Sequence, residues 1–334
     1  MIETDIGIIG AGPVGLFAVF EAGLLKMRCH LVDVLPQIGG QLSEIYPKKP
    51  IYDIPGLPAV NAQELVDNLK KQIEPFKPTF SLGEKVTGLV RNADGSFSLT
   101  TSDNTVVHCK VVVIAGGLGC FEPRKPELKN LTEFEGNGVV YMVKDPETFR
   151  GKKIVIAGGG DSALDWSIYL SEVAEKVTLI HRNESFRGAP DSAEKVVALA
   201  EKGKIDLILS ANLQAVNGNG VLNSVSYTDK ANQSRDIEAD YLIPLFGLSP
   251  KLGPIADWGL NLDKSAIIVN TFDYATNVEG IFAIGDINTY PGKLKLILCG
   301  FHEGALMAQS AFRFVYPNQK LSFKYTTVNG VNAF

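Results

Sequence analysis

Two glycine-rich turns are the segments of this chain with the clearest chemical meaning. Each follows an apolar run typical of a strand and precedes a stretch of helical composition. The turns read Gly10-Ala-Gly12-Pro13-Val-Gly15 and Gly158-Gly-Gly160-Asp161-Ser162-Ala163. Glycines let such a backbone approach a pyrophosphate, and the start of the following helix offers unpaired N–H groups to the same anion. We therefore expect each turn to bind a dinucleotide.

The residue that ends the next strand distinguishes the two expected ligands. The same offset of 23 positions leads from Gly10 to Asp33 (33 − 10) and from Gly158 to His181 (181 − 158). A carboxylate at this place accepts hydrogen bonds from a ribose and repels a 2′-phosphate, which favours FAD at the first turn. His181 is followed by Arg182 and Arg187, and a cationic site without an acid favours NADP(H) at the second turn. The alternative is that both arginines are solvated surface residues.

These turns need a repeated strand–helix–strand unit to position them, and the sequence contains two copies. Each copy closes with a further apolar strand, and both predict an α/β fold with two Rossmann-like nucleotide-binding domains, each a three-layer ββα arrangement. The expected strands are 5–10, 29–33 and 111–115 in the first copy and 153–157, 177–181 and 241–245 in the second. The strand 280–285 and a helix near 300–315 cannot complete the second copy, so we expect them to return to the first.

The second domain is therefore expected to be inserted into the first. We place the FAD-binding domain at residues 1–115 and 248–334 and the NADP(H)-binding domain at residues 116–247. Hinges are expected at Gly116-Gly117 and at Gly247-Leu-Ser-Pro250.

Composition excludes several classes of function. The chain has 334 residues and a net charge of −5, which argues against a general nucleic-acid binder. It has no apolar run of about 18 residues and begins without a basic leader region, so we expect a cytoplasmic protein that does not enter the membrane. The four cysteines form no C-x-x-C pair and no zinc-ligand pattern, and we expect them to be buried apolar residues: Cys29, Cys109, Cys120 and Cys299.

Taken together, these motifs resemble the thioredoxin-reductase-like type of ferredoxin/flavodoxin–NADP+ reductase, nearly from end to end. The segments that carry the resemblance, besides the two turns, are Gly39-Gly-Gln-Leu42, Tyr46-Pro47, Tyr52-Asp-Ile-Pro-Gly56, His181-Arg182, Phe186-Arg187 and Ile284-Gly-Asp286.

The resemblance implies roles for further residues. Asp33 would hold the adenosine ribose of FAD, Gln41 would lie at the flavin end, and Asp286 would bind the ribitol or pyrophosphate. Val86 and Phe121 would both contact FAD, in the region around its adenine and the junction of the two domains. Tyr46 would stack on one face of the isoalloxazine and Tyr325 on the other, so these two tyrosines would be the catalytic residues. The hydroxyl of Thr326 or Thr327 would lie near the flavin ring. Each position also has a plain structural alternative, such as a turn former at Asp286. His302 is expected to be structural or to lie on the pyrophosphate side of the site, not to be catalytic.

The chain departs from thioredoxin reductases in one respect. Those enzymes carry a C-x-x-C pair just before the second glycine turn, whereas the corresponding stretch here, residues 138–147, contains no cysteine. A thiolate relay is therefore excluded, and electrons must leave from the flavin. The resemblance implies NADPH-dependent reduction of ferredoxin or flavodoxin by a homodimer. An acidic carrier would need a basic patch, for which Lys48 with Lys49, Arg124 with Lys125, and Lys293 with Lys295 are candidates.

Two alternatives remain at this point. One is an NADPH diaphorase that reduces quinones, free flavins or iron chelates without a protein partner. The other is a non-enzymatic flavin sensor, against which the intact second turn with Arg182 and Arg187 weighs.

Overall fold

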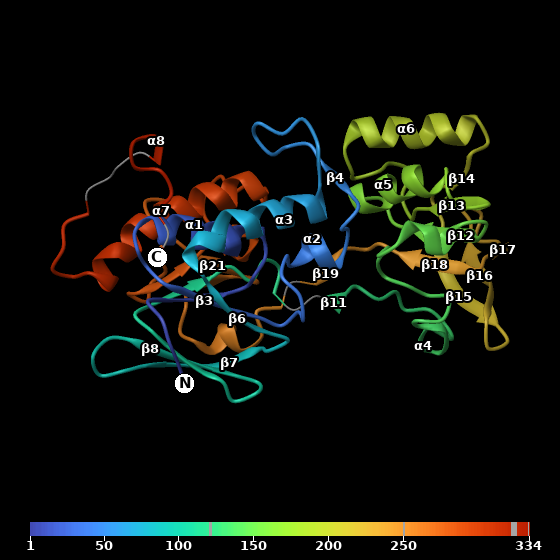
Figure 1. Ribbon diagram of the computed structural model, residues 1–334. Coiled ribbons are helices and arrows are strands. Elements are labelled where there is room, and N and C mark those ends of the chain that lie inside the picture. The colour runs from blue at the N-terminus through green and yellow to red at the C-terminus, as the bar shows by residue number, and fades with distance from the viewer. Residues whose placement is uncertain (120–121, 250, 322–325, 333) are drawn as a thin grey trace. The chain divides into compact units, whose positions relative to one another are not determined.

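The computed structural model describes residues 1–119, 122–249, 251–321, 326–332 and 334. The chain divides into two compact units (Figure 1), which we call unit 1 (Met1–Phe121 and Pro250–Phe334) and unit 2 (Glu122–Ser249). Both units are mixed α/β with parallel sheets, as the repeated motif predicts. The division lies six residues after the first boundary expected from the sequence (122 against 116) and two after the second (250 against 248).

Unit 1 is built on a five-stranded sheet in the order β22-β10-β2-β3-β6. All of its neighbouring strands run parallel. The strands are β2 (Ile6–Ile9), β3 (Cys29–Asp33), β6 (Thr79–Leu82), β10 (Val111–Ile114) and β22 (Ile281–Ala283). Every residue of β3 and β10 is buried, as expected for central strands covered on both faces. Because β22 pairs with β10, the chain returns to unit 1 after unit 2 is complete.

Two further layers cover this sheet, with helices on one side and a second sheet on the other (Figure 1). The helices are α1 (Pro13–Leu24), α3 (Ala62–Ile73) and α7 (Ile297–Val315). The second sheet has the order β1-β9-β8-β7 and consists of β1 (Ile2–Glu3), β7 (Val86–Arg91), β8 (Phe97–Thr101) and β9 (Val106–Cys109). One continuous apolar core joins the three layers, which confirms the three-layer ββα arrangement.

The short elements of unit 1 lie in its connections. They are α2 (Gln41–Glu44), β4 (Pro50–Ile51), β5 (Val60–Asn61), β20 (Leu262–Asp263), β21 (Ala266–Ile268), β23 (Asn288–Thr289) and α8 (Thr326–Asn329). Single 3-10 turns occupy Glu74–Phe76, Gly253–Asp257 and Gly285–Ile287.

Unit 2 repeats the plan of unit 1 with a four-stranded parallel sheet in the order β14-β13-β12-β18. Its strands are β12 (Lys153–Ala157), β13 (Lys176–Ile180), β14 (Ile205–Ile208) and β18 (Tyr241–Pro244), and its helices are α4 (Leu131–Phe134), α5 (Asp161–Leu170) and α6 (Pro190–Glu201). An antiparallel sheet adds β15 (Asn212–Gly218), β16 (Leu222–Thr228) and β17 (Ser234–Glu238). A 3-10 turn occupies Pro146–Phe149, and the two chain ends of the unit pair as β11 (Glu122–Pro123) and β19 (Leu248–Ser249).

Candidate nucleotide-binding sites

The three glycines of the first turn meet three different requirements. Gly10 has φ +113°, and a Cβ there would lie 2.4 Å from the Ala115 carbonyl oxygen, so the turn itself excludes a side chain. A Cβ on Gly15 would lie 2.1 Å from the Gly10 carbonyl oxygen, so the packing of α1 on β2 excludes one as well. At Gly12 the nearest atom to a Cβ would be the Gly40 Cα, at 3.9 Å. No described residue requires a glycine at position 12, and the room for a side chain there suits the close approach of a ligand to the backbone, in what we call the cradle.

The amino end of α1 presents free backbone donors to this cradle. No side chain caps the helix, and its first turn contains no acidic residue. Pro13 occupies the first helical position, where a missing N–H costs nothing. The first N–H groups of a helix have no partner within it, and they attract an anion together with the helix dipole. The cradle therefore suits a pyrophosphate.

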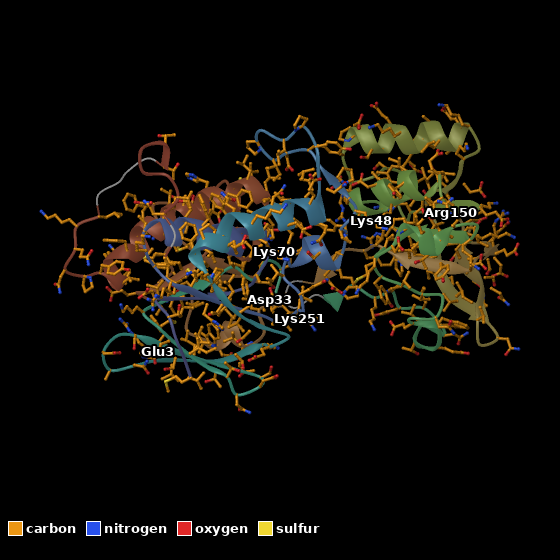
Figure 2. All side chains as sticks on the ribbon, in the orientation of Figure 1. Glu3, Asp33, Lys48, Lys70, Arg150 and Lys251 are labelled. Carbon is orange, nitrogen blue, oxygen red and sulfur yellow. The ribbon has the colours of Figure 1, made fainter. Side chains whose placement is uncertain are left out.

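Asp33 ends β3 beside this turn and is labelled in Figure 2. Its Oδ2 accepts a hydrogen bond of 2.6 Å from the Ala11 N–H, and its Oδ1 accepts one of 2.8 Å from the Leu35 N–H. Burial raises the pKa of this carboxyl, while the bonds from Leu35 and Ala11 oppose the rise. Asp33 thus fixes the glycine turn and keeps further oxygen lone pairs that a ribose hydroxyl can use.

Three of the residues that the resemblance places at the flavin end lie near the turn or near one another. Tyr46 is half-buried against the core of unit 1, and burial followed by the charges of Asp286 and Asp53 raises its pKa to about 12. The side-chain amide of Gln41 lies beside Gly117, within 3.3 Å of where a Cβ on that glycine would be.

Asp286 lies in the 3-10 turn that follows β22. It is half-buried, and burial raises the pKa of its carboxyl. No hydrogen bond to this carboxylate is found among the described residues. A half-buried carboxylate to which no described residue donates a hydrogen bond fits the hydroxyl groups of a ribitol chain.

The remaining positions named from the sequence lie in β7 and in the tail. Val86 is buried in the core at the start of β7. Thr326 and Thr327 begin α8 with exposed side chains, and the tail beyond them packs at the carboxyl end of α1. There the Lys26 ammonium donates to the Asn332 carbonyl at 2.9 Å. Because α1 has 12 residues and rises about 1.5 Å per residue, this contact lies at the far end of the helix from Gly12. Phe121 and Tyr325 lie outside the described residues.

The sequence interpretation was wrong about Lys293. Its side chain is only 6% exposed and forms an ion pair with Glu303, which is fully buried in α7. Lys293 is therefore unsuited to a docking patch. Sequence reasoning missed Glu303 altogether, although a signal exists: it stands at helical spacing among buried small and apolar residues, namely Gly300, Gly304, Met307, Ala308 and Ala311.

In unit 2, the ring of His181 packs against the second glycine turn. A Cβ on Gly159 would lie 2.2 Å from the ring of His181, so the imidazole packs directly on this glycine. The His181 Nε2 is 3.1 Å from the Ser185 carbonyl oxygen, and the ring stacks on Phe186 with centroids 5.5 Å apart. Burial lowers the pKa of His181, the hydrogen bond to Ser185 opposes this change, and the charges of Arg182 and Arg187 lower the pKa further. The lowered pKa favours the neutral ring, so the positive charge beside this turn is mainly that of the two arginines.

The loop that carries Arg187 is tied to the second turn through its backbone. The Arg187 N–H donates to the Gly159 carbonyl at 2.7 Å, and the Asp161 Oδ1 accepts a bond of 2.7 Å from the Ala189 N–H. A Cβ on Gly160 would lie 3.8 Å from the Arg187 guanidinium. The cation therefore lies beside the turn that the sequence assigned to a phosphate.

Both arginines are available to a ligand. Arg182 and Arg187 are exposed, and neither forms an ion pair within the described part of the chain. No side chain caps α5. Ser162 is exposed in the first turn of that helix, and Ala163 is fully buried against Gly158, where a Cβ would come within 2.9 Å of the alanine Cβ. This donor set fits a dinucleotide with an additional phosphate.

The described residues contain no group of three or more His, Cys, Asp or Glu side chains that could hold a metal ion. None of the helices in the described ranges combines the length and the apolar character needed to cross a bilayer.

Known proteins resemble this chain over almost its whole length. The sequence model of the pyridine nucleotide-disulphide oxidoreductase family matches residues 4–304. The Ferredoxin--NADP reductase 1 of Christiangramia forsetii is 60% identical over 100% of this chain and 96% of its own length. The ferredoxin–NADP reductase of Flavobacterium johnsoniae is 59% identical over 100% of this chain and 95% of its own.

Among solved structures, the thioredoxin reductase of Lactococcus lactis aligns with a TM-score of 0.80 at 27% identity, covering 94% of this chain and 99% of its own. The fold, the two glycine turns with their uncapped helices and the full-length matches all indicate the same family. This chain is a member of the pyridine nucleotide-disulphide oxidoreductase family, in which its near relatives are ferredoxin–NADP reductases.

Proposed function

We propose that this protein is a ferredoxin–NADP reductase that binds FAD in unit 1 and NADP(H) in unit 2. The observation that carries the proposal is the difference in charge around the matching positions Asp33 and His181. Asp33 is a buried carboxylate, whereas His181 is followed by Arg182 and Arg187, which form no ion pair with described residues. A flavin nucleotide has a free ribose for the carboxylate, whereas NADP(H) has a 2′-phosphate for the cations. Two full-length relatives named ferredoxin–NADP reductase support the same conclusion.

The residues of unit 1 bind and orient the flavin nucleotide. The amino end of α1 holds the pyrophosphate at Gly12, Asp33 accepts from the adenosine ribose, and Asp286 accepts from the ribitol. Tyr46 covers the ring system and limits access of water. When bound, FAD would supply the redox chemistry, which couples a two-electron donor such as NADPH to a one-electron acceptor. No side chain needs to act as acid or base in the hydride step.

The cysteines support direct transfer from the flavin to the acceptor. No C-x-x-C pair exists in the sequence. Cys29 and Cys109 are buried, and burial raises the pKa of the Cys109 thiol to about 12, so neither forms a reactive thiolate at neutral pH. Electrons therefore leave unit 1 without a dithiol relay, which suits a one-electron carrier protein.

The proposal is tested by rapid-mixing reoxidation of the NADPH-reduced protein. Purified ferredoxin, flavodoxin and a quinone are the three acceptors, and flavin absorbance reports the rate. Fast reoxidation by ferredoxin or flavodoxin supports the reductase. Reoxidation by the quinone alone would make the protein a diaphorase, and a colourless protein that cannot be reconstituted with FAD would refute both.

We further propose a cytoplasmic homodimer that uses flavodoxin as well as ferredoxin. The C-terminal tail gives the argument for a dimer, because the described part of it packs at the end of α1 that is distant from Gly12. Thr326 and Thr327 then serve the flavin of a second copy rather than that of their own chain. Light scattering of the eluting protein measures the mass, and a single-chain mass at working concentration would contradict this part of the proposal.

A further inference from the structure

One buried carboxylate, that of Glu303, receives four hydrogen bonds. Its Oε2 accepts from the Gly285 N–H at 2.6 Å and from the Asn288 Nδ2 at 2.8 Å. Its Oε1 accepts from the Tyr290 hydroxyl at 2.9 Å and from the Lys293 ammonium. The Glu303 side chain is 0% exposed. A carboxylate so deeply buried is retained only where its donors and its counter-charge are in place.

The two donors to Oε2 connect α7 with the segment that carries Asp286. Gly285 is the first residue of the 3-10 turn 285–287, and the Asn288 side chain also donates to the Ala283 carbonyl at 2.9 Å. Glu303 therefore ties the end of β22, the turn and the start of β23 to one point on a 19-residue helix. The position of the Asp286 backbone depends on this anchor.

The donors to Oε1 supply the counter-charge. Lys293 is 6% exposed, and its ammonium lies over the Tyr290 ring at 5.3 Å from the centroid. A lysine buried this deeply needs a nearby negative charge, since an isolated buried ammonium would lose its proton. Lys293 therefore balances the charge of Glu303. The nearby Lys295, in contrast, is exposed to solvent.

We infer that Glu303 and Lys293 act as a positioning pair for the FAD site. Glu303 holds the turn that carries Asp286, and Lys293 provides the counter-charge that the fully buried Glu303 requires, so that the Asp286 carboxylate is held in place for the flavin nucleotide. This inference rests on the proposal that unit 1 binds FAD.

The charged and titratable groups that face Asp286 make the inference specific. They are Lys293, Lys295 and Glu303 on the following loop and helix, together with Tyr46. Burial raises the pKa of Asp286, the two lysines lower it, and Glu303 raises it. Removing the charge of Lys293 therefore raises the pKa of Asp286 further, whereas removing the charge of Glu303 lowers it. A loss of packing alone would produce no such opposite effects.

The experiment titrates FAD into apoprotein between about pH 5 and pH 9 and reads the quenching of flavin fluorescence. The variants are Glu303→Gln, Lys293→Met and the two combined. Because ionised Asp286 is the stronger acceptor, wild-type affinity is expected to rise with pH through one midpoint. Lys293→Met is expected to move that midpoint up and Glu303→Gln to move it down. At pH 7 we expect Lys293→Met to weaken FAD binding by at least about tenfold.

The combined variant tests the pairing and protects against poor folding of the single variants. Glu303→Gln keeps a side-chain oxygen for Gly285 and Asn288, and Lys293→Met removes the ammonium that would otherwise be unpaired, so most of the lost affinity is expected to return. Lys176→Met removes an exposed ion pair with Asp206 in unit 2 and serves as the matched control.

Three outcomes would overturn the inference. Both single variants could keep the wild-type midpoint, both could move it in the same direction, or the combined variant could bind FAD no better than the weaker single one. A wild-type apoprotein that binds no FAD would instead overturn the proposed function.

Discussion

The substitution Gly12→Ala is expected to weaken FAD binding while leaving the stability of the apoprotein nearly unchanged. The added methyl group would have its nearest protein neighbour, the Gly40 Cα, at 3.9 Å, which is an ordinary contact. Gly12 has φ −74° and ψ 179°, a conformation that alanine adopts freely. Losing glycine at the start of α1 costs a fraction of a kcal/mol, and the reduced freedom of the unfolded chain offsets it. We therefore expect the free energy of unfolding of the apoprotein to change by less than about 1 kcal/mol.

FAD binding is expected to suffer strongly, because the methyl group occupies the cradle against which the pyrophosphate packs. A loss of at least about 100-fold corresponds to about 2.7 kcal/mol. In urea unfolding, FAD at about 100 times the wild-type Kd stabilises the wild type by about 2.7 kcal/mol and the variant by only about 0.4 kcal/mol.

Gly15→Ala provides the contrast. Its Cβ would lie 2.1 Å from the Gly10 carbonyl oxygen, so the backbone must move, and we expect the apoprotein itself to lose about 1–3 kcal/mol. The reasoning is refuted if Gly12→Ala binds FAD as the wild type does, or if its apoprotein is destabilised as much as that of Gly15→Ala.

Three further predictions concern the second site and the partner. Replacing Arg182 and Arg187 by Gln is expected to raise the KM for NADPH about 10–100-fold, with little change in kcat and no change in the kinetics with NADH. An equal loss of activity with NADH would contradict a 2′-phosphate site. Because the pKa of His181 lies below its ordinary 6.5, its contribution to stability is complete above pH 6.5 and is lost as pH falls through the lowered value. Urea midpoints should therefore fall less between about pH 7.5 and 5.5 in His181→Gln than in the wild type, and equal falls would argue against this. Charge reversal at Lys48 and Lys49 is expected to weaken ferredoxin reduction but not dye reduction, and equal losses would exclude docking there.

The sequence predicted the strands beside the glycine turns closely. Cys29–Asp33 and Lys153–Ala157 have the expected bounds, and Asp33 lies where its offset from Gly10 indicated. These features depend on local spacing and on the continuous apolar runs of buried parallel strands, which a single sequence displays directly.

The features that escaped prediction depend on contacts between distant segments. Lys293 was assigned to the surface because lysines usually are exposed, and only the fold brings Glu303 beneath it. The neutral state of His181 depends in the same way on its burial against Gly159 and on two nearby guanidinium groups. The position of the tail at Lys26 follows from a contact 306 residues apart in the sequence.

The insertion of unit 2 has a consequence for how the protein is made. Synthesis completes β10 well before β22, the strand that covers its edge, and unit 2 lies between them. At about 5–20 residues per second, the nascent chain spends roughly 10 seconds or more with one edge of β10 unpaired. All four residues of that strand are buried in the finished protein. Ribosome-bound chains that end after Ser249 should therefore recruit chaperones, and they should release them once α7 has left the exit tunnel.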